Sequence, residues 1–200
     1  MTRHADVPCW LSVGDLADEH GQYEAVPAPL YWIKGNNEGF DAIADGSLPE
    51  NCRFLANGTL RDVEGLRIAG LGGTFAPSWY DTEPAELPHP RKASARATAL
   101  ADKRRHYVRA EVDACTRLRG VDVFLTHEAP RPFRIGRIDA GKTQISEILT
   151  AMQPRLHLFG HHHRFSEGAR QGVTSVGLDL VSRSYLIIDS ATLAYERQSL

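Results

Sequence analysis

Four side chains that can bind a metal ion each stand at or just after the end of a short apolar run: Asp15, Asn36, His127 and His161. A fifth, His163, lies two positions beyond His161, so one loop can present two imidazoles to two neighbouring ions. Together they offer carboxylate and amide oxygens and ring nitrogens but no thiolate, a donor set that suits Mn, Fe, Zn or Ni. The sequence therefore predicts a divalent-metal centre.

The apolar runs that carry these residues are typical of strands buried on both faces. They are continuous in Val, Leu, Ile and aromatic residues rather than alternating, and they end at Gly, Asp, Asn or His. Ligands of helix-covered sheets bind beyond the carboxyl ends of the strands, so we expect the four residues to converge on one point. The expected strands are 8–15, 29–38, 66–73, 121–127 and 156–161.

The rest of the chain predicts a mixed α and β domain that spans residues 1–200. A tight hairpin is expected around Glu64-Gly65, and apolar residues at helical spacing predict a long helix over 93–119, with Gly120 as its C-cap. A shorter helix over 142–152 and strands between 173 and 195 complete the pattern. The Pro-rich stretch 76–92 is irregular, and Trp79 and Tyr80 within it either stack on a base or anchor the loop to the core.

Composition narrows the classes of partner and the compartment. The chain has 23 basic and 25 acidic side chains, so any attraction to a polyanion must be local. Three widely spaced cysteines form no CxxC pair, which predicts neither a disulfide framework nor a thiolate zinc site and fits a reducing cytoplasm. No apolar run approaches the roughly 20 residues that cross a bilayer, so we expect a cytoplasmic protein without membrane contact.

The order and spacing of four motifs resemble the calcineurin-like metallophosphoesterases. GDLAD at 14–18, GNNE at 35–38, TH at 126–127 and GHHH at 160–163 match four of the five motifs of that superfamily. The blocks YWIKGNNE and LGGTFAP are most similar to lariat debranching enzymes and their bacterial relatives. The resemblance implies an α/β fold in which a two-sheet β-sandwich is flanked by helices. No D-x-H or D-x-C precedes Val13, so we expect the first strand to be lacking, and we interpret this as a misassigned start or a truncated gene.

The resemblance also implies a division of labour among the ligands. Asp15 bridges two ions, Asn36, His127 and His161 complete one ion site, and His163 belongs to the other. The family site holds two ions, and we expect one in this chain because the second site keeps only Asp15 and His163. The implied activity is hydrolysis of phosphoric esters, diesters above all, by a metal-activated hydroxide. Two alternatives stay open: a catalytically weak single-metal remnant that acts as a binding or regulatory domain, and an RNA-processing phosphodiesterase.

Several neighbours of the ligands have expected supporting roles. Asn37 stands where many superfamily members have histidine, so we expect it to contact the substrate phosphate without supplying a proton, which favours aryl phosphodiesters. Asp18 and Glu38 are expected to orient ligands, and His162 either does the same or faces solvent. The cations of the predicted long helix either contact substrate phosphates, including those of a nucleic acid, or form a solvated helix face with the interleaved acidic residues. The cations are Arg96, Lys103, Arg104, Arg105 and Arg109, and the candidate phosphate contacts among them are Arg104, Arg105 and Arg109.

Overall fold

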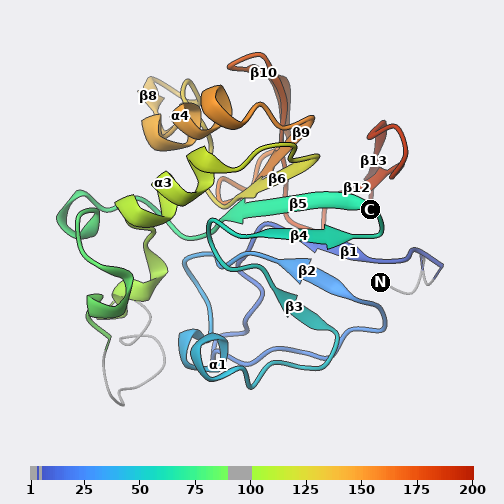
Figure 1. The fold of residues 1–200 in the computed structure, drawn as a ribbon. Helices are drawn as coiled ribbons and strands as arrows, with labels where there is room; N and C mark the ends of the chain where they lie inside the picture. Colours follow the sequence, from blue (N-terminus) through green and yellow to red (C-terminus); the bar gives the residue numbers. More distant parts are fainter. Residues whose placement is uncertain (1–3, 5, 90–100) are drawn as a thin grey trace.

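Two β-sheets dominate the computed structural model, which describes residue 4 and residues 6–89 and 101–200 (Figure 1). The smaller sheet is parallel, with β1 (Trp10–Ser12), β2 (Leu30–Trp32) and β3 (Cys52–Phe54) in that order. The larger sheet has the order β10-β11-β9-β6-β5-β4, and its four inner strands are parallel. Its strands are β4 (Leu60–Val63), β5 (Leu66–Leu71), β6 (Val123–Thr126), β9 (Leu156–Phe159), β10 (Ser166–Arg170) and β11 (Val173–Gly177).

The two sheets pack face to face through one apolar cluster. Ile33 and Leu55 follow strands of the small sheet, and they meet Leu125, Leu158 and Val176 of the large sheet. All five side chains are buried, and burial of a side chain of this size contributes about 1.5–3 kcal/mol. This layer fixes the small sheet against the large one, so the loops after β1 and β2 lie beside those after β6 and β9.

Helices cover the other face of the large sheet. α3 (Arg109–Arg117) and α4 (Thr143–Met152) lie together on this face (Figure 1), where Val112, Ile145 and Ile148 pack against the sheet. The small sheet has its own outer cluster around Trp32, next to α1 (Phe40–Asp45). The expected two-sheet α/β sandwich with flanking helices is confirmed.

The strands that the sequence predicted are present. Each of the five apolar runs contains one strand, namely β1, β2, β5, β6 or β9. The hairpin between β4 and β5 turns at Glu64 and Gly65, whose φ angles of 51° and 80° suit a tight turn. α4 and the strands after residue 173 are also confirmed.

The single long helix expected over 93–119 is wrong within the described residues. The chain forms a short 3-10 turn, η4 (Lys103–Arg105), then an extended segment, and only then α3. Long-range contacts hold this segment out of a helix: the amide of Thr74 donates to the carbonyl of Arg105 at 3.0 Å, and Nζ of Lys34 donates to the carbonyls of Arg104 and His106 at 2.9 and 3.2 Å. Those carbonyls are then less available to a helical ladder. Residues 93–100 of the expected helix lie outside the described residues.

Short elements complete the chain. The Pro-rich stretch contains η2 (Pro77–Trp79) and η3 (Pro84–Glu86), and a small hairpin of β7 (Arg134–Ile135) and β8 (Ile138–Asp139) follows β6. β12 (Ser184–Ile188) and β13 (Tyr195–Ser199) form a two-stranded sheet. Among the described residues no helix has the length and apolar character that crossing a membrane requires.

A neutral histidine lies inside the large sheet. His157 on β9 is fully buried between the rings of Phe124 and Phe159. The hydroxyl of Thr126 donates to the carbonyl of Glu128, so Nε2 of His157 is the donor in its 2.9 Å bond to Thr126, and Nδ1 faces the hydroxyl of Ser175 at 3.0 Å. Burial lowers the pKa of His157 to about 3.

This buried ring makes stability depend on pH. In the unfolded chain the ring takes up a proton below its ordinary pKa of 6.5, whereas the folded protein resists protonation down to a pKa of about 3. The free energy of unfolding should therefore fall as pH drops through this window, by up to about 1.4 kcal/mol per pH unit. In urea denaturation at pH 7.5, 6 and 5 with a chelator present, we expect the fall to be shallower in His157→Gln than in the wild type. Parallel pH curves for the two proteins would contradict this assignment.

Candidate metal centre

Three of the expected ligands meet where the two sheets come together. Asp15, His127 and His161 each offer one donor atom, and these atoms all lie within 4.8 Å of one another. The Oδ1 atom of Asn36 is 3.1 Å from Nε2 of His127. Nε2 of His127 is also 3.1 Å from Nδ1 of His161 and 3.6 Å from Oδ2 of Asp15. Four loops from two sheets thus bring four donor atoms to one point.

The spacing of these atoms fits a common ion. Donors about 2.0–2.2 Å from a first-row divalent ion in tetrahedral or octahedral geometry lie roughly 2.8–3.6 Å from one another. The three distances measured from Nε2 of His127 fall within that range. The donor set has two imidazole nitrogens, one amide oxygen and one carboxylate, with no sulfur. The residues present therefore fit a divalent transition metal.

The ring of His127 is oriented for this role by the backbone of the small sheet. Its side chain is 1% exposed, and Nδ1 donates to the carbonyl of Val13 at 2.7 Å. This bond places the proton on Nδ1 and leaves the lone pair of Nε2 directed at the other donors. Burial lowers the pKa of His127 and lowers that of His161 to about 4, so both rings are neutral near pH 7.

The loops that carry the ligands adopt conformations that few residues tolerate. Asp15 and His161 have φ angles of 60° and 65°, in the left-handed region. The two loops of the small sheet also approach each other closely, because a Cβ atom on Gly14 would lie 2.5 Å from the backbone nitrogen of Gly35. Non-glycine residues at positive φ persist where surrounding contacts hold them, and they concentrate at functional sites.

Glu38 supplies the contacts that hold these two loops. It is 7% exposed, and Oε1 accepts hydrogen bonds from the amides of Asp15 at 2.7 Å and Gly35 at 2.8 Å. Oε2 accepts from the hydroxyl of Tyr23 at 2.9 Å. Burial raises the pKa of Glu38 to about 7 despite these donors. Glu38 thus contacts the loops that carry Asp15 and Asn36, and its role in positioning ligands stays a prediction.

His163 and Asn37 stand at the exposed side of the site. His163 is exposed, has a φ angle of 47° and lies outside the group of three close donors, although its charge contributes to lowering the pKa of His127. Asn37 donates its backbone amide to Oδ1 of Asp15 at 2.8 Å, and its side-chain amide lies 3.4 Å from Oδ2. An exposed amide beside a ligand carboxylate is suitably placed to meet a substrate.

The two other expected supporting residues have different surroundings. His162 is half-buried, its ring stacks on Phe133 with centroids 4.6 Å apart, and it meets the ring of His161 edge-on. Asp18 accepts from the amides of His20 and Gln22, both at 2.8 Å, so the bonds that we find for it lie within its own exposed turn. His162 therefore contacts a candidate ligand directly, whereas Asp18 shapes the loop after Asp15.

The three arginines expected on one helix lie on two elements, Arg104 and Arg105 on the turn η4 and Arg109 on α3. Arg104 binds the buried carboxylate of Asp102 and also Asp41, and Arg109 binds Asp81. Arg105 lies on the same turn, and its charge contributes to lowering the pKa of His127.

Three residues near the centre have no counterpart among the sequence expectations. Glu128 follows His127, is 4% exposed, accepts from the amide of Phe75 at 2.6 Å and lies 3.2 Å from Nζ of Lys142. Lys142 lowers the pKa of His161, which indicates its proximity to the site. Tyr23 reaches Glu38 from a loop with no motif. Only the position of Glu128, next to a candidate ligand, was a signal in the sequence.

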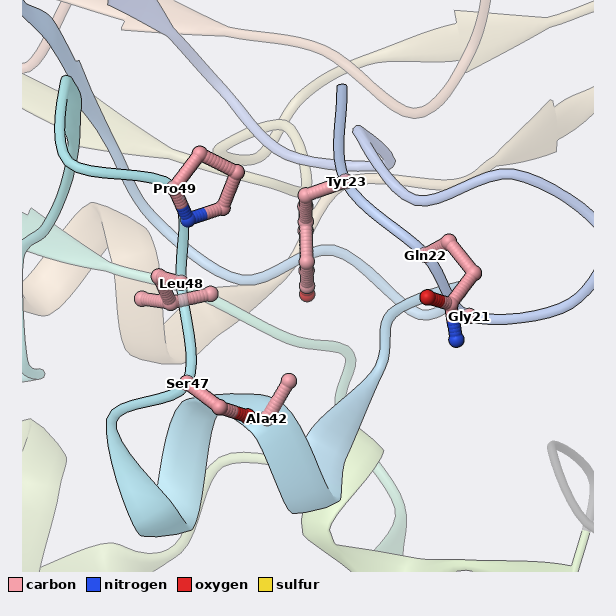
Figure 2. Close-up of a pocket in the computed structure, with 7 residues that line it drawn as sticks. All are labelled: Gly21, Gln22, Tyr23, Ala42, Ser47, Leu48 and Pro49. Atoms are coloured by element: carbon pink, nitrogen blue, oxygen red, sulfur yellow. The ribbon is translucent and has the colours of Figure 1, made fainter. Parts of the chain in front are cut away.

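A cavity of ≈ 350 Å³ lies behind this arrangement, on the side of α1 (Figure 2). Its lining comes from α1 and from the loops before β2 and before β3, and it includes none of the four candidate ligands. The cavity and the centre are connected through Tyr23, which lines the cavity and donates to Glu38. The remaining lining residues are Gly21, Gln22, Ala42, Ser47, Leu48 and Pro49.

Comparison with known proteins finds distant sequence relatives and solved structures with a similar fold. The lariat debranching enzyme of Schizosaccharomyces pombe is 23% identical over 180 residues, which cover 78% of this chain and 37% of that enzyme. The lariat debranching enzyme of Drosophila melanogaster is 25% identical over 160 residues, or 68% of this chain and 29% of that enzyme. The chain thus spans about a third of the length of these relatives. No family model matches the chain.

Solved structures establish the fold. The protein TT1561 of Thermus thermophilus superposes with a TM-score of 0.54 at 18% identity, over 86% of this chain and 72% of that protein. A second solved structure gives a TM-score of 0.59 at 13% identity, over 86% of this chain and 66% of the other. Both neighbours have the calcineurin-like fold. The chain has the calcineurin-like phosphoesterase fold. With the debranching enzymes, this confirms the resemblance at the level of the metallophosphoesterase superfamily.

The Glu38 contacts predict a loss of metal affinity when they are broken. In Glu38→Ala both acceptor oxygens are lost, so the amides of Asp15 and Gly35 lose the side chain that ties their loops together. We expect the affinity for Mn²⁺ or Zn²⁺ to fall about 10–100-fold, measured by calorimetric titration. Tyr23→Phe removes one donor and should have a smaller effect. The control Glu64→Ala changes an exposed turn, and equal affinities of Glu38→Ala and this control would refute the positioning role.

Proposed function

We propose that this chain is a metal-dependent hydrolase of phosphoric esters and that phosphodiesters are its preferred substrates. The observation that carries the proposal is the approach of four donor atoms, from Asp15, Asn36, His127 and His161, to one point beside an exposed loop. The distant similarity to debranching enzymes, which belong to a metallophosphoesterase family, supports the same class of reaction.

The chain's own groups divide the work as follows. Asp15, Asn36, His127 and His161 hold one divalent ion, which when bound lowers the pKa of water and neutralises phosphoryl oxygens. The carbonyl of Val13 keeps the ring of His127 in the tautomer that binds. The side chain of Asn37 donates to a phosphoryl oxygen of the substrate, because it is exposed and already directed along the carboxylate of Asp15.

A second candidate function is that of a single-metal binding domain without turnover. It is favoured by one observation: among the described residues, only one group of three or more close His, Cys or acidic donors exists, and His163 is outside it. The metal-binding half of the proposal is common to both candidates. Hydrolysis distinguishes them.

Removal of the central ligand tests the proposed site. In His127→Ala the donor atom that lies 3.1–3.6 Å from the other three is lost, so we expect bound metal to fall well below the wild-type stoichiometry of about one ion per chain. Hydrolysis of bis-p-nitrophenyl phosphate should fall roughly 100-fold or more. Elemental analysis and the rate of p-nitrophenolate release measure the two effects. The control His20→Ala removes a side chain that is 71% exposed and should match the wild type.

The outcomes separate the candidates. Metal binding without hydrolysis in the wild type would support the binding-domain function and contradict the hydrolase function. Unchanged metal content in His127→Ala would overturn both.

The identity of residue 37 predicts a preference among leaving groups. An amide does not act as an acid, so esters whose leaving oxygen needs a proton should react slowly, whereas p-nitrophenolate departs without one. We expect the rate ratio of aryl to alkyl phosphodiesters to fall in Asn37→His, because an imidazole at this position can supply the proton. A ratio that is the same in both proteins would contradict this role.

A further inference from the structure

The hairpin of β7 and β8 extends from the chain directly after the His127 loop. Its strands pair Arg134 with Asp139 and Ile135 with Ile138, and Gly136, with a φ angle of 60°, forms the turn. Directly opposed residues in an antiparallel pair lie on the same face, so the two isoleucines form one apolar face. Ile135 is 45% and Ile138 is 72% exposed. Because both isoleucines are exposed to this extent, they contribute little to the hydrophobic core.

The same hairpin carries a net positive charge, whereas the whole chain does not. Residues 131–142, which we call the basic hairpin, contain Arg131, Arg134, Arg137 and Lys142 against the single acidic residue Asp139. The whole chain has a net charge of −2. Asp139 is bound by Arg131 at 2.9 Å and accepts from the amide of Phe133, so it is engaged at the base of the hairpin. Exposed arginine side chains at 134 and 137 therefore dominate the tip.

The base of the basic hairpin is fixed to the metal centre. Phe133 packs on the ring of His162 at 4.6 Å and, edge-on, on Phe159 at 5.4 Å. At the other end the amide of Lys142 donates to the carbonyl of Ala129 at 2.9 Å. Both ends of the hairpin thus contact the loops that carry His127 and His161. The base of the basic hairpin therefore lies beside the candidate metal centre.

We propose that the basic hairpin binds single-stranded nucleic acid, and this inference rests on the proposed phosphodiesterase function of the centre. Arg134 and Arg137 contact backbone phosphates, as arginine does in most such interfaces. Ile135 and Ile138 pack on the faces of bases, which are accessible in a single strand but stacked in a duplex. From Phe133 to Gly136 the hairpin extends about 10 Å, or about three stacked nucleotides at roughly 3.4 Å each. The substrate class of the centre is then an oligonucleotide rather than a small diester.

The test compares two variants of equal charge change. Arg134→Glu with Arg137→Glu alters the tip, whereas Arg61→Glu with Arg117→Glu alters two exposed arginines on β4 and α3. Binding of a fluorescent 12-nucleotide single strand is measured by anisotropy in a chelator, so it requires neither metal nor turnover. We expect the tip variant to bind about 10-fold more weakly or worse, with a shallower salt dependence, and the control to lose much less. Thermal unfolding confirms that both variants fold.

A third variant separates base contacts from phosphate contacts. Ile135→Ser with Ile138→Ser should weaken oligonucleotide binding about 3-fold or more while the salt dependence stays that of the wild type. Equal loss in tip and control variants, absent binding of the wild-type chain at low salt, or an isoleucine variant that binds the strand normally would each overturn the proposal. Failure of bis-p-nitrophenyl phosphate hydrolysis would instead count against the centre, because the binding assay contains no metal.

Discussion

A buried carboxylate sets the geometry on which the centre depends. Glu38 accepts the amides of Asp15 and Gly35, and so it ties together the chain segments that leave β1 and β2. Glycine at 14 and 35 allows the two backbones to approach closely enough for one side chain to reach both. Burial of an ionised carboxylate is costly, and its raised pKa, about 7, shows that its donors offset only part of that cost. The buried carboxylate therefore lowers the free energy of unfolding, but it fixes the positions of Asp15 and Asn36.

The second contribution comes from the way the sheets meet. β6 and β9 are neighbouring parallel strands, so His127 and His161 leave the same edge of the large sheet. The bond from His127 to the carbonyl of Val13 then crosses from the large sheet to the small one. The apolar layer between the sheets keeps this distance fixed. Because each ligand depends on a different strand, the packing of the sandwich and the coordination geometry are coupled.

Sequence reasoning succeeded where a residue's neighbours in the chain decide its place. Continuous apolar runs located the five strands, and the ligand-type residues at the ends of four runs are those whose donor atoms lie close together in the fold. It failed where a distant contact decides the backbone: Lys34 holds the carbonyls after Asp102, and the expected long helix is broken there. Likewise the contact of Tyr23 with Glu38 joins segments 15 positions apart without any motif. Local pattern does not encode such contacts.

The arginines show that the sequence pattern also fails to predict which charged side chains form ion pairs. Their spacing in the sequence indicated a basic face, but ion pairs with Asp41, Asp81 and Asp102 form only in the folded chain. Two exposed arginines, Arg134 and Arg137, lie on a short hairpin whose two-residue strands give little periodic signal. The fold thus adds a basic segment to those of η4 and α3, and the base of this segment packs against His162.

The most direct measurement of the central claim is the X-ray absorption spectrum of the zinc-loaded protein. The account predicts nitrogen and oxygen scatterers alone, about 2.0–2.2 Å from the ion, with the outer-shell pattern of imidazole rings that weakens in His127→Ala. A sulfur scatterer at about 2.3 Å, or a spectrum that His127→Ala leaves unchanged, would contradict it.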